Sequence, residues 1–194
     1  MNSTEVLDLL ERDGAVRRGH FVLSSGLHSD TYIQCAQVLQ WPGLAERFGH
    51  EIGLRLEPTQ PTTVLGPAMG GIIIAHEVAR KLGLRMVFSE RVAGSMTLRR
   101  DFALDLGERV VVIEDVVTTG GSQKEVIELV SQAGAEVCGV GSIVDRSAGV
   151  SFGVPLESLV TIQAPRWQPE ECPLCAAGEE VASPGSRRIG QTTG

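Results

Sequence analysis

One stretch decides the expected fold: Val110-Val111-Val112-Ile113-Glu114-Asp115-Val116-Val117-Thr118-Thr119-Gly120-Gly121-Ser122. Its run of four apolar residues predicts a strand covered on both faces. Two adjacent carboxylates follow, then hydroxyl residues and glycines, and a helix is expected to run to about residue 133, where Gly134 ends it. Open α/β sheets bind ligands at the carboxyl edge of their strands, so this loop is the candidate site.

The alternation of strands and helices continues on both sides of this stretch. It predicts an α/β fold with a mostly parallel, twisted sheet flanked by helices. The expected elements are a strand at 63–66, a loop at 66–71, a helix at 72–82 and strands at 84–88 and 137–144. The polar residues 89–101 lie between two strands, which predicts either a mobile loop or a two-stranded flap.

The two ends of the chain are less regular. Towards the N-terminus we expect a helix at 5–10 capped by Thr4, strands at 20–23 and 31–35, and a helix at 42–56 that Pro42 begins. After residue 166 the chain is rich in Pro, Glu and Gly, and residues 183–194 are expected to be disordered. We therefore expect a domain at 1–165, with 1–40 contributing to a hood, and an extension at 166–194.

Composition excludes several classes of function. The 194 residues carry a net charge of -7, and Lys and Arg are scattered, which argues against a nucleic-acid or membrane partner. No apolar run approaches the roughly 20 residues that span a bilayer. The acidic, amphipathic N-terminus is unlike a signal peptide, so a cytoplasmic location is expected.

The cysteines and histidines give no clear metal site in the sequence. Cys35 and Cys138 have apolar neighbours and are expected in the core. Cys172 and Cys175 form one Cys-Pro-Leu-Cys, whereas a closed zinc site needs four ligands and no His is near in sequence. A local turn is favoured over a metal shared between two subunits. The histidines (His20, His28, His50 and His76) are dispersed, so no metal ligands are predicted.

The loop after the acids has the features of a phosphate site. Glycines let backbone amides approach an anion, and the exposed amides at a helix start point toward it. No lysine follows the glycines, which disfavours a nucleotide P-loop, and the spacing is not Gly-x-Gly-x-x-Gly. Glu114 and Asp115 fit a ligand with a ribose, because their carboxylates can accept hydrogen bonds from its hydroxyls. They also fit a sugar that becomes positively charged during the reaction. The alternative is an ordinary acidic turn before a capped helix.

This stretch resembles the motif of type I phosphoribosyltransferases that binds 5-phosphoribosyl-1-pyrophosphate (PRPP). Glu114 and Asp115 match its acids, and the hydroxyl and glycine residues match its 5-phosphate loop. The resemblance implies PRPP with Mg²⁺ chelated mainly by PRPP, a hood over the sheet and a mobile loop. The PRPP-binding residues it implies are Glu114, Asp115, Val116, Val117, Thr118, Thr119, Gly120, Gly121, Ser122, Ala68, Met69, Gly70, Gly71 and Arg91.

Three further stretches, 21–32, 66–72 and 144–146, resemble the orotate branch of that family. The resemblance assigns Thr118, Arg146, Ser25 and Tyr32 to orotate. A fixed guanidinium suits this role because orotate carries a carboxylate that the common purine bases lack. The alternative for Arg146 is a local ion pair with Asp145.

The sequence departs from that branch where lysines are expected. Ser24 and Gly70 replace lysines, and in the loop at 89–101 only Arg91 occupies a comparable place, with Arg99 and Arg100 later. We hypothesise that these arginines, with Mg²⁺, replace the missing cations, so that Glu114, Asp115, Arg99 and Arg100 are the catalytic candidates. A solvated basic turn is the alternative.

The expected activity is transfer of the phosphoribosyl group from PRPP to orotate, giving orotidine 5′-phosphate and pyrophosphate in UMP biosynthesis. The resemblance implies a homodimer. A purine-base phosphoribosyltransferase stays open because of the missing lysines. A non-catalytic PRPP-binding regulator is the other alternative, against which the acidic composition argues.

Overall fold

The computed structural model describes residues 1–23 and 25–184 and has a six-stranded sheet at its centre. Ser24 and residues 185–194 of the tail expected to be disordered lie outside the described residues. The strand order is β5-β4-β3-β6-β7-β8, and only the β4–β5 pair is antiparallel. The bounds are β3 Thr63–Pro67, β4 Arg85–Val92, β5 Ser95–Leu98, β6 Arg109–Val117, β7 Glu136–Asp145 and β8 Leu156–Thr161. The predicted mostly parallel α/β fold is confirmed.

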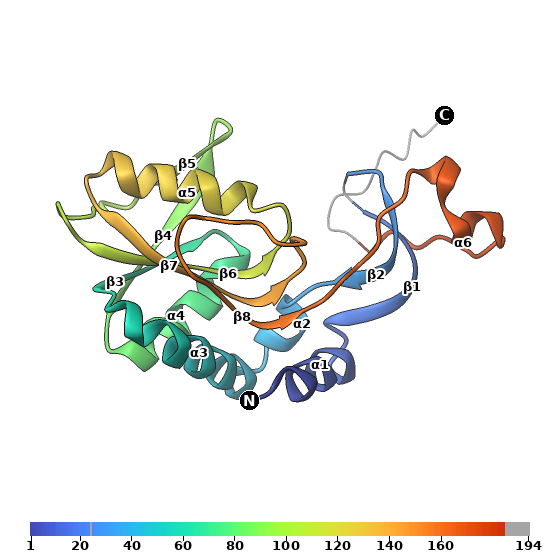
Figure 1. Cartoon of the computed structure of the whole chain (residues 1–194), viewed down its shortest axis with the longest axis horizontal. Coiled ribbons are helices and arrows are strands. Elements are labelled where there is room, and N and C mark those ends of the chain that lie inside the picture. The colour runs from blue at the N-terminus through green and yellow to red at the C-terminus, as the bar shows by residue number, and fades with distance from the viewer. Residues whose placement is uncertain (24, 185–194) are drawn as a thin grey trace.

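Helices cover both faces of this sheet (Figure 1). α3 (Pro42–Leu56) and α4 (Gly70–Leu82) lie on one face, and α5 (Gly121–Gln132) lies on the other. Pro42 begins α3 as predicted, since its missing N–H costs nothing in the first turn. Gly83 ends α4 with φ of 68°, a conformation that glycine adopts without a steric penalty.

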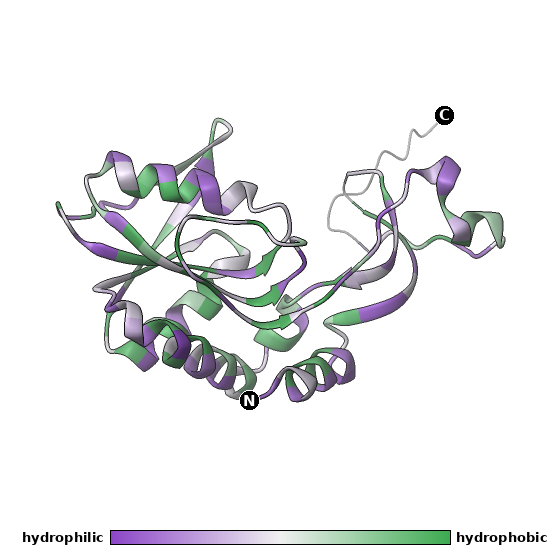
Figure 2. Cartoon of the chain, viewed as in Figure 1, coloured by the Kyte–Doolittle hydropathy of each residue, from purple (hydrophilic) through white to green (hydrophobic). Residues whose placement is uncertain are grey.

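Alternation along β6 produces two core layers. Val111 and Ile113 belong to the cluster that includes α3 and α4, whereas Val110 and Val112 pack with α5. All four side chains are fully buried, which explains the uninterrupted apolar run in the sequence. Figure 2 shows the same organisation in the helices, where hydrophobic and hydrophilic bands alternate along α1 (Ser3–Arg12) and α3.

The N-terminal residues form a group of elements that we call the hood, and part of it packs into the main core through residues such as Val6, Leu10 and Val38. It contains α1, an antiparallel hairpin of β1 (Val16–Val22) and β2 (His28–Ile33), and α2 (Ala36–Leu39). The predicted cap Thr4 is wrong: Asn2 caps α1, accepting from the Glu5 amide at 2.9 Å while Glu5 bonds back to Asn2. The hairpin strands begin earlier than the predicted ones because both are partly exposed, so hydrophobic periodicity marks them poorly.

The C-terminal part of the described chain returns to the hood. After β8 it forms two short helices, η2 (Pro169–Glu171) and α6 (Pro173–Ala176). The amides and carbonyls of His28 and Trp167 exchange two hydrogen bonds of 2.9 Å, and Ala182 bonds the backbone of His20 and Val22. In Figure 1 this segment lies beside β1 and β2, away from the main sheet. The division at residue 165 stays a prediction.

The stretch at 89–101 contains a two-stranded flap. β4 extends to Val92 and pairs with β5 from Ser89 to Leu98, so the flap alternative is the one observed. A short 3-10 helix, η1 (Glu57–Thr59), joins α3 to β3. In the described part of the chain, no helix has the length and apolar character needed to cross a membrane.

Candidate functional site

The two acids lie near the carboxyl end of β6, and both carboxyl groups reach the glycine pair after β3: a Cβ at Gly70 would lie 2.7 Å from Asp115 Oδ1, and one at Gly71 would lie 3.2 Å from Glu114 Oε1. The strand continues to Val117, past the predicted end at Ile113. Glu114 follows the alternation of Val112 and lies on the α5 side, where the Gln123 Nε2 donates to its Oε2 at 3.4 Å. Asp115 lies on the α4 side, and its Oδ1 accepts from the Val116 amide at 2.8 Å.

Burial raises the pKa of both members of this carboxyl pair. Desolvation, reinforced by the neighbouring Asp115, raises the pKa of Glu114 to about 9, and desolvation also raises the pKa of Asp115. Among the ion pairs of residues 1–23 and 25–184, none involves either acid. The carboxyl pair therefore has no compensating cation in the described chain. This arrangement suits a ligand that carries a bound cation.

The loop after β3 lies directly against the acids. A Cβ built at Gly70 would lie 2.7 Å from Asp115 Oδ1, and one at Gly71 would lie 2.7 Å from the Ile113 carbonyl oxygen. The lysine that the family resemblance implies at position 70 therefore has no room unless Asp115 moves. Ala68 and Met69 precede this pair, with Met69 strongly exposed, and the peptide bond between them is cis.

The loop from Thr118 to Ser122 joins β6 to α5, and within it the Gly121 amide donates a long hydrogen bond of 3.4 Å to Thr119 Oγ1. Gly120 has φ of 76°, and a Cβ there would lie 2.9 Å from Val150 Cγ2, so only glycine fits. No side chain caps α5 at Gly120, while Thr118 and Thr119 are exposed. The first amides of a helix have no partner within it and attract anions. The predicted phosphate loop thus has suitable geometry.

Arg146 lies beside that loop at the end of β7. Its amide donates to the Val117 carbonyl at 2.9 Å, while its Nε and Nη2 are buried without a hydrogen-bond partner among the described residues. Burial, with a smaller effect of nearby Arg166, lowers the pKa of Arg146. Asp145 instead accepts from the Ser147 amide at 2.8 Å, so the alternative ion pair between Arg146 and Asp145 is not formed.

The hairpin candidates lie in the hood. The Tyr32 hydroxyl donates to Gln34 Oε1 at 3.1 Å, and its ring packs 5.7 Å from Phe21. Ser25 is exposed, and its Oγ accepts weakly from the Leu27 amide at 3.5 Å. No hydrogen bond among the described residues joins Ser25 or Tyr32 to the acids, so their proposed contact with a base stays a prediction.

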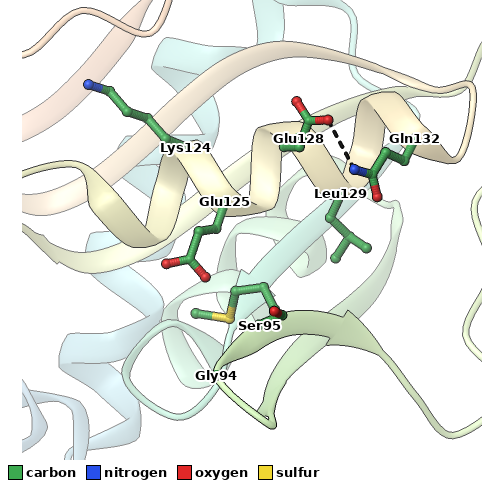
Figure 3. Close-up of a pocket in the computed structure, with 8 residues that line it drawn as sticks. Gly94, Ser95, Lys124, Glu125, Glu128, Leu129 and Gln132 are labelled. Atoms are coloured by element: carbon green, nitrogen blue, oxygen red, sulfur yellow. Dashed lines mark hydrogen bonds between the residues drawn. The ribbon is translucent and has the colours of Figure 1, made fainter.

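The flap arginines face partners other than the acids. Arg91 pairs with Glu125 on α5, with Nη1–Oε2 at 2.8 Å. Arg100 pairs with Glu90 at 3.0 Å and lies over the Phe88 ring. The flap and α5 enclose an open groove lined by Ser95, Glu125 and Leu129 (Figure 3). This groove lies along the side of α5, and none of the predicted site residues lines it. Its one link to them is Glu125, which pairs with Arg91.

Two residues near the predicted site were missed in the sequence. Gln123 is buried and bonds Glu114, and Arg166 is close enough to influence Arg146. Gln123 could have been found as the next residue of the helix start. Arg166 could not, because only the folded chain brings the segment after β8 beside β7.

The fold and the acid-and-glycine edge define a phosphoribosyltransferase domain, and the phosphoribosyl transferase domain family matches residues 36–154. The orotate phosphoribosyltransferases of Caldanaerobacter subterraneus and Thermotoga maritima are 52% and 51% identical to the chain. The former alignment covers 97% of this chain and 100% of the relative, the latter 95% and 99%. The crystal structure of the Aeropyrum pernix orotate phosphoribosyltransferase is similar at 31% identity with a TM-score of 0.69, covering 81% of this chain and 93% of that one.

The chain belongs to the orotate phosphoribosyltransferase family. Leishmania donovani UMP synthase is also similar, with 26% identity and a TM-score of 0.71 over 82% of this chain and 36% of that one.

Proposed function

We propose that the chain transfers the 5-phosphoribosyl group of PRPP to N1 of orotate, releasing pyrophosphate and orotidine 5′-phosphate. Relatives about half identical over nearly the full length carry the name of this activity. The activity places the chain in UMP biosynthesis as a pentosyltransferase.

The observation that carries the choice of base is the guanidinium of Arg146. Its Nε and Nη2 are buried and unpartnered among the described residues, although a buried donor without an acceptor is costly. Nε and Nη2 form one fork of the guanidinium, and a carboxylate accepts from both at once. Orotate supplies that carboxylate at the position beside the phosphate loop. A neutral purine would leave this fork unsatisfied.

Each part of the strand edge has a distinct role in the reaction. The amides and hydroxyls from Thr118 to Ser122 hold the 5-phosphate, which positions the sugar for attack. Glu114 and Asp115 accept from the ribose hydroxyls and favour the positive charge that develops on the sugar ring as pyrophosphate leaves. No covalent intermediate with the protein is required.

The charge of the carboxyl pair fits a ligand-bound divalent cation. Carboxylate oxygens are donors that Mg²⁺ prefers, and this ion is usually held by one or two carboxylates together with substrate phosphates rather than by an all-protein cage. Mg²⁺ would therefore enter with PRPP, where it neutralises charge on the diphosphate. Asp115, beside the glycines after β3, is the carboxylate best placed to face it.

The remaining parts of the proposal concern the flap and the assembly. Arg91, Arg99 and Arg100 supply positive charge to the leaving pyrophosphate once the flap leaves α5, and Ala68 to Gly71 supply backbone donors. Ser25 and Tyr32 of the hood line the base pocket. A homodimer and a cytoplasmic location are further parts of this proposal and rest on the family resemblance and composition.

The deciding experiment follows orotate absorbance with purified protein, PRPP and Mg²⁺. Loss of orotate with matching orotidine 5′-phosphate is the expected result. A competition series with adenine, guanine and hypoxanthine serves as the control for base choice. Turnover of a purine without turnover of orotate would replace the proposed substrate, and PRPP binding without turnover of any base would identify a regulator.

A further inference from the structure

Four potential metal ligands meet between the hairpin of the hood and the returning C-terminal segment. They are His20 near the end of β1, His28 at the start of β2, and Cys172 and Cys175 at α6. Their ligand atoms all lie within 4.8 Å of one another, and three of the four residues are buried. The fold therefore brings two histidines that are distant in the sequence beside the two cysteines.

The ring of His20 is oriented so that its free nitrogen faces the cluster. Its Nδ1 lies 2.9 Å from the Glu179 carbonyl oxygen, which can only accept, so Nδ1 carries the proton. Nε2 then has one lone pair, directed toward the other three residues. A histidine that binds metal through one nitrogen commonly donates from the other to a carbonyl in this way.

Hydrogen bonds alone do not account for the contacts of this nitrogen. His20 Nε2 lies 2.8 Å from His28 Nδ1, 3.5 Å from Cys172 Sγ and 3.6 Å from Cys175 Sγ. Cys175 Sγ also lies 3.3 Å from His28 Nδ1. One lone pair cannot accept three hydrogen bonds, whereas a cation at the centre would satisfy all four atoms together.

We propose that His20, His28, Cys172 and Cys175 bind one structural Zn²⁺. Two thiolates and two imidazoles are a donor set typical of zinc, and four protein ligands close the tetrahedron and leave no position for substrate. Bonds of about 2.0–2.3 Å give tetrahedral edges of roughly 3.3–3.8 Å. The sulfur–nitrogen separations of 3.3–3.6 Å match these edges, and the two nitrogens would separate slightly around the ion.

The location of the cluster explains why a metal is useful there. The two hydrophobic clusters of the described chain include no residue of β2's first half or of residues 166–184. Phe21 and Cys172 are buried in this region but belong to neither cluster. Small substructures that lack a core of their own are commonly held by metals or disulfides. Zinc would join β1, β2 and the C-terminal segment without taking part in the reaction.

The first test measures metal in the full-length protein, purified without chelator, by inductively coupled plasma mass spectrometry. We expect about one zinc per chain, with most of it lost in Cys172→Ser and in Cys175→Ser, because each change removes one of the four ligands that close a structural site. Cys138→Ala is the matched control, because Cys138 is a buried free thiol outside the cluster. Full zinc in both serine variants would overturn the site, as would a loss of zinc in the control.

The second test identifies the ligands even if a variant folds poorly. Zinc K-edge X-ray absorption of the unaltered protein should show two sulfur and two nitrogen neighbours, and cobalt substitution should give thiolate charge-transfer bands with intense tetrahedral ligand-field bands. Iron in place of zinc would contradict the metal assignment. Protein that stays free of metal after incubation with zinc, or whose Cys172 and Cys175 are joined in a disulfide, would overturn the proposal. Neither test depends on the enzymatic activity.

Discussion

Arg146 combines a permanent charge with partial burial, and the described chain gives two of its three nitrogens no acceptor. Burial lowers the pKa of the group, yet a guanidinium stays charged at neutral pH. A protein can retain such a group when a ligand supplies the missing hydrogen-bond acceptors. At the scale of single residues, the choice of base therefore depends on one side chain.

We expect Arg146→Ala to raise the KM for orotate by about 10- to 100-fold, because the variant loses the hydrogen bonds from the guanidinium to the charged carboxylate of the substrate. The KM for PRPP should change little, because the phosphate loop is intact. Steady-state kinetics with each substrate varied in turn measures both. Arg80→Ala, which removes an exposed arginine paired with Glu46 and Glu77, is the control. An unchanged KM for orotate in the Arg146 variant would exclude the carboxylate contact.

Glu114 makes the stability of the ligand-free protein depend on pH. Its folded pKa of about 9 exceeds the ordinary value of 4.5, so the folded state keeps a proton that the unfolded state releases. Stability is therefore full below the unfolded pKa and is lost as pH rises toward the folded pKa. We expect the melting temperature of Glu114→Gln, relative to that of the unaltered protein, to increase as pH rises from about 5 to about 9.

Thermal melts across this pH range, without ligands, measure the effect. Glu125→Gln is the control: the pairing with Arg91 lowers the pKa of Glu125, so that group is ionised in both states above about pH 6. A constant difference between Glu114→Gln and the unaltered protein would mean that Glu114 is ionised in the folded state.

At the scale of elements, the β6–α5 loop depends on one left-handed glycine. Gly120→Ala would place a Cβ only 2.9 Å from Val150 Cγ2 on a backbone with φ of 76°. Because both effects strain the loop, we expect the variant to lose about 1–3 kcal/mol of stability and to have a higher KM for PRPP. Gly121→Ala is the matched control for stability, since its Cβ would meet only Thr119 Oγ1 at 3.5 Å. Equal denaturant midpoints for the two variants would show that the loop is not constrained at Gly120.

The flap gives a prediction at the same scale. The exposed Arg91–Glu125 pair holds the flap near α5, and such pairs contribute at most about 1 kcal/mol. We expect Glu125→Gln to leave turnover within about twofold, whereas Arg91→Ala should raise the KM for PRPP by about tenfold or more. Equal effects of the two changes would mean that Arg91 serves only as the tether.

The sequence predicted those elements whose physical signals are local. The run at 110–113, Pro42 and Gly83 mark β6, α3 and the end of α4 because burial on both faces or backbone geometry restricts the residue type. Glu114 and Asp115 were recognisable because two adjacent charges directly follow a buried apolar run. The strands of the hood were placed poorly, because partly exposed strands lack a clear pattern.

Long-range contacts escaped prediction for a different reason. His20 and Cys172 are 152 residues apart, and no local spacing relates them. The proximity of Arg166 to Arg146 likewise depends on the path of the chain after β8. Pairing between distant segments becomes visible only when the fold brings the segments together.

At the scale of the whole molecule, the C-terminal segment packs against the hairpin of the hood. Ser29 Oγ donates to the Pro165 carbonyl at 2.7 Å, and Trp167 pairs with His28. A chain ending at residue 165 should therefore melt at a lower temperature and lose protection of β1 and β2 in hydrogen exchange, while β3 and β6 stay protected. Unchanged protection of the hairpin would establish that residues 1–165 fold as a complete domain.

The antiparallel pairing of His28 with Trp167 also sets an order of events during synthesis. The hairpin leaves the ribosome early, but its partners at 167–182 are among the last described residues to be made. At about 5–20 residues per second, the hairpin waits on the order of ten seconds for them. The sheet can form during this interval, so the nascent protein passes through a stage with a finished phosphate loop and an unfinished hood. The unpaired hairpin edge is then open to chaperones or to a neighbouring nascent chain.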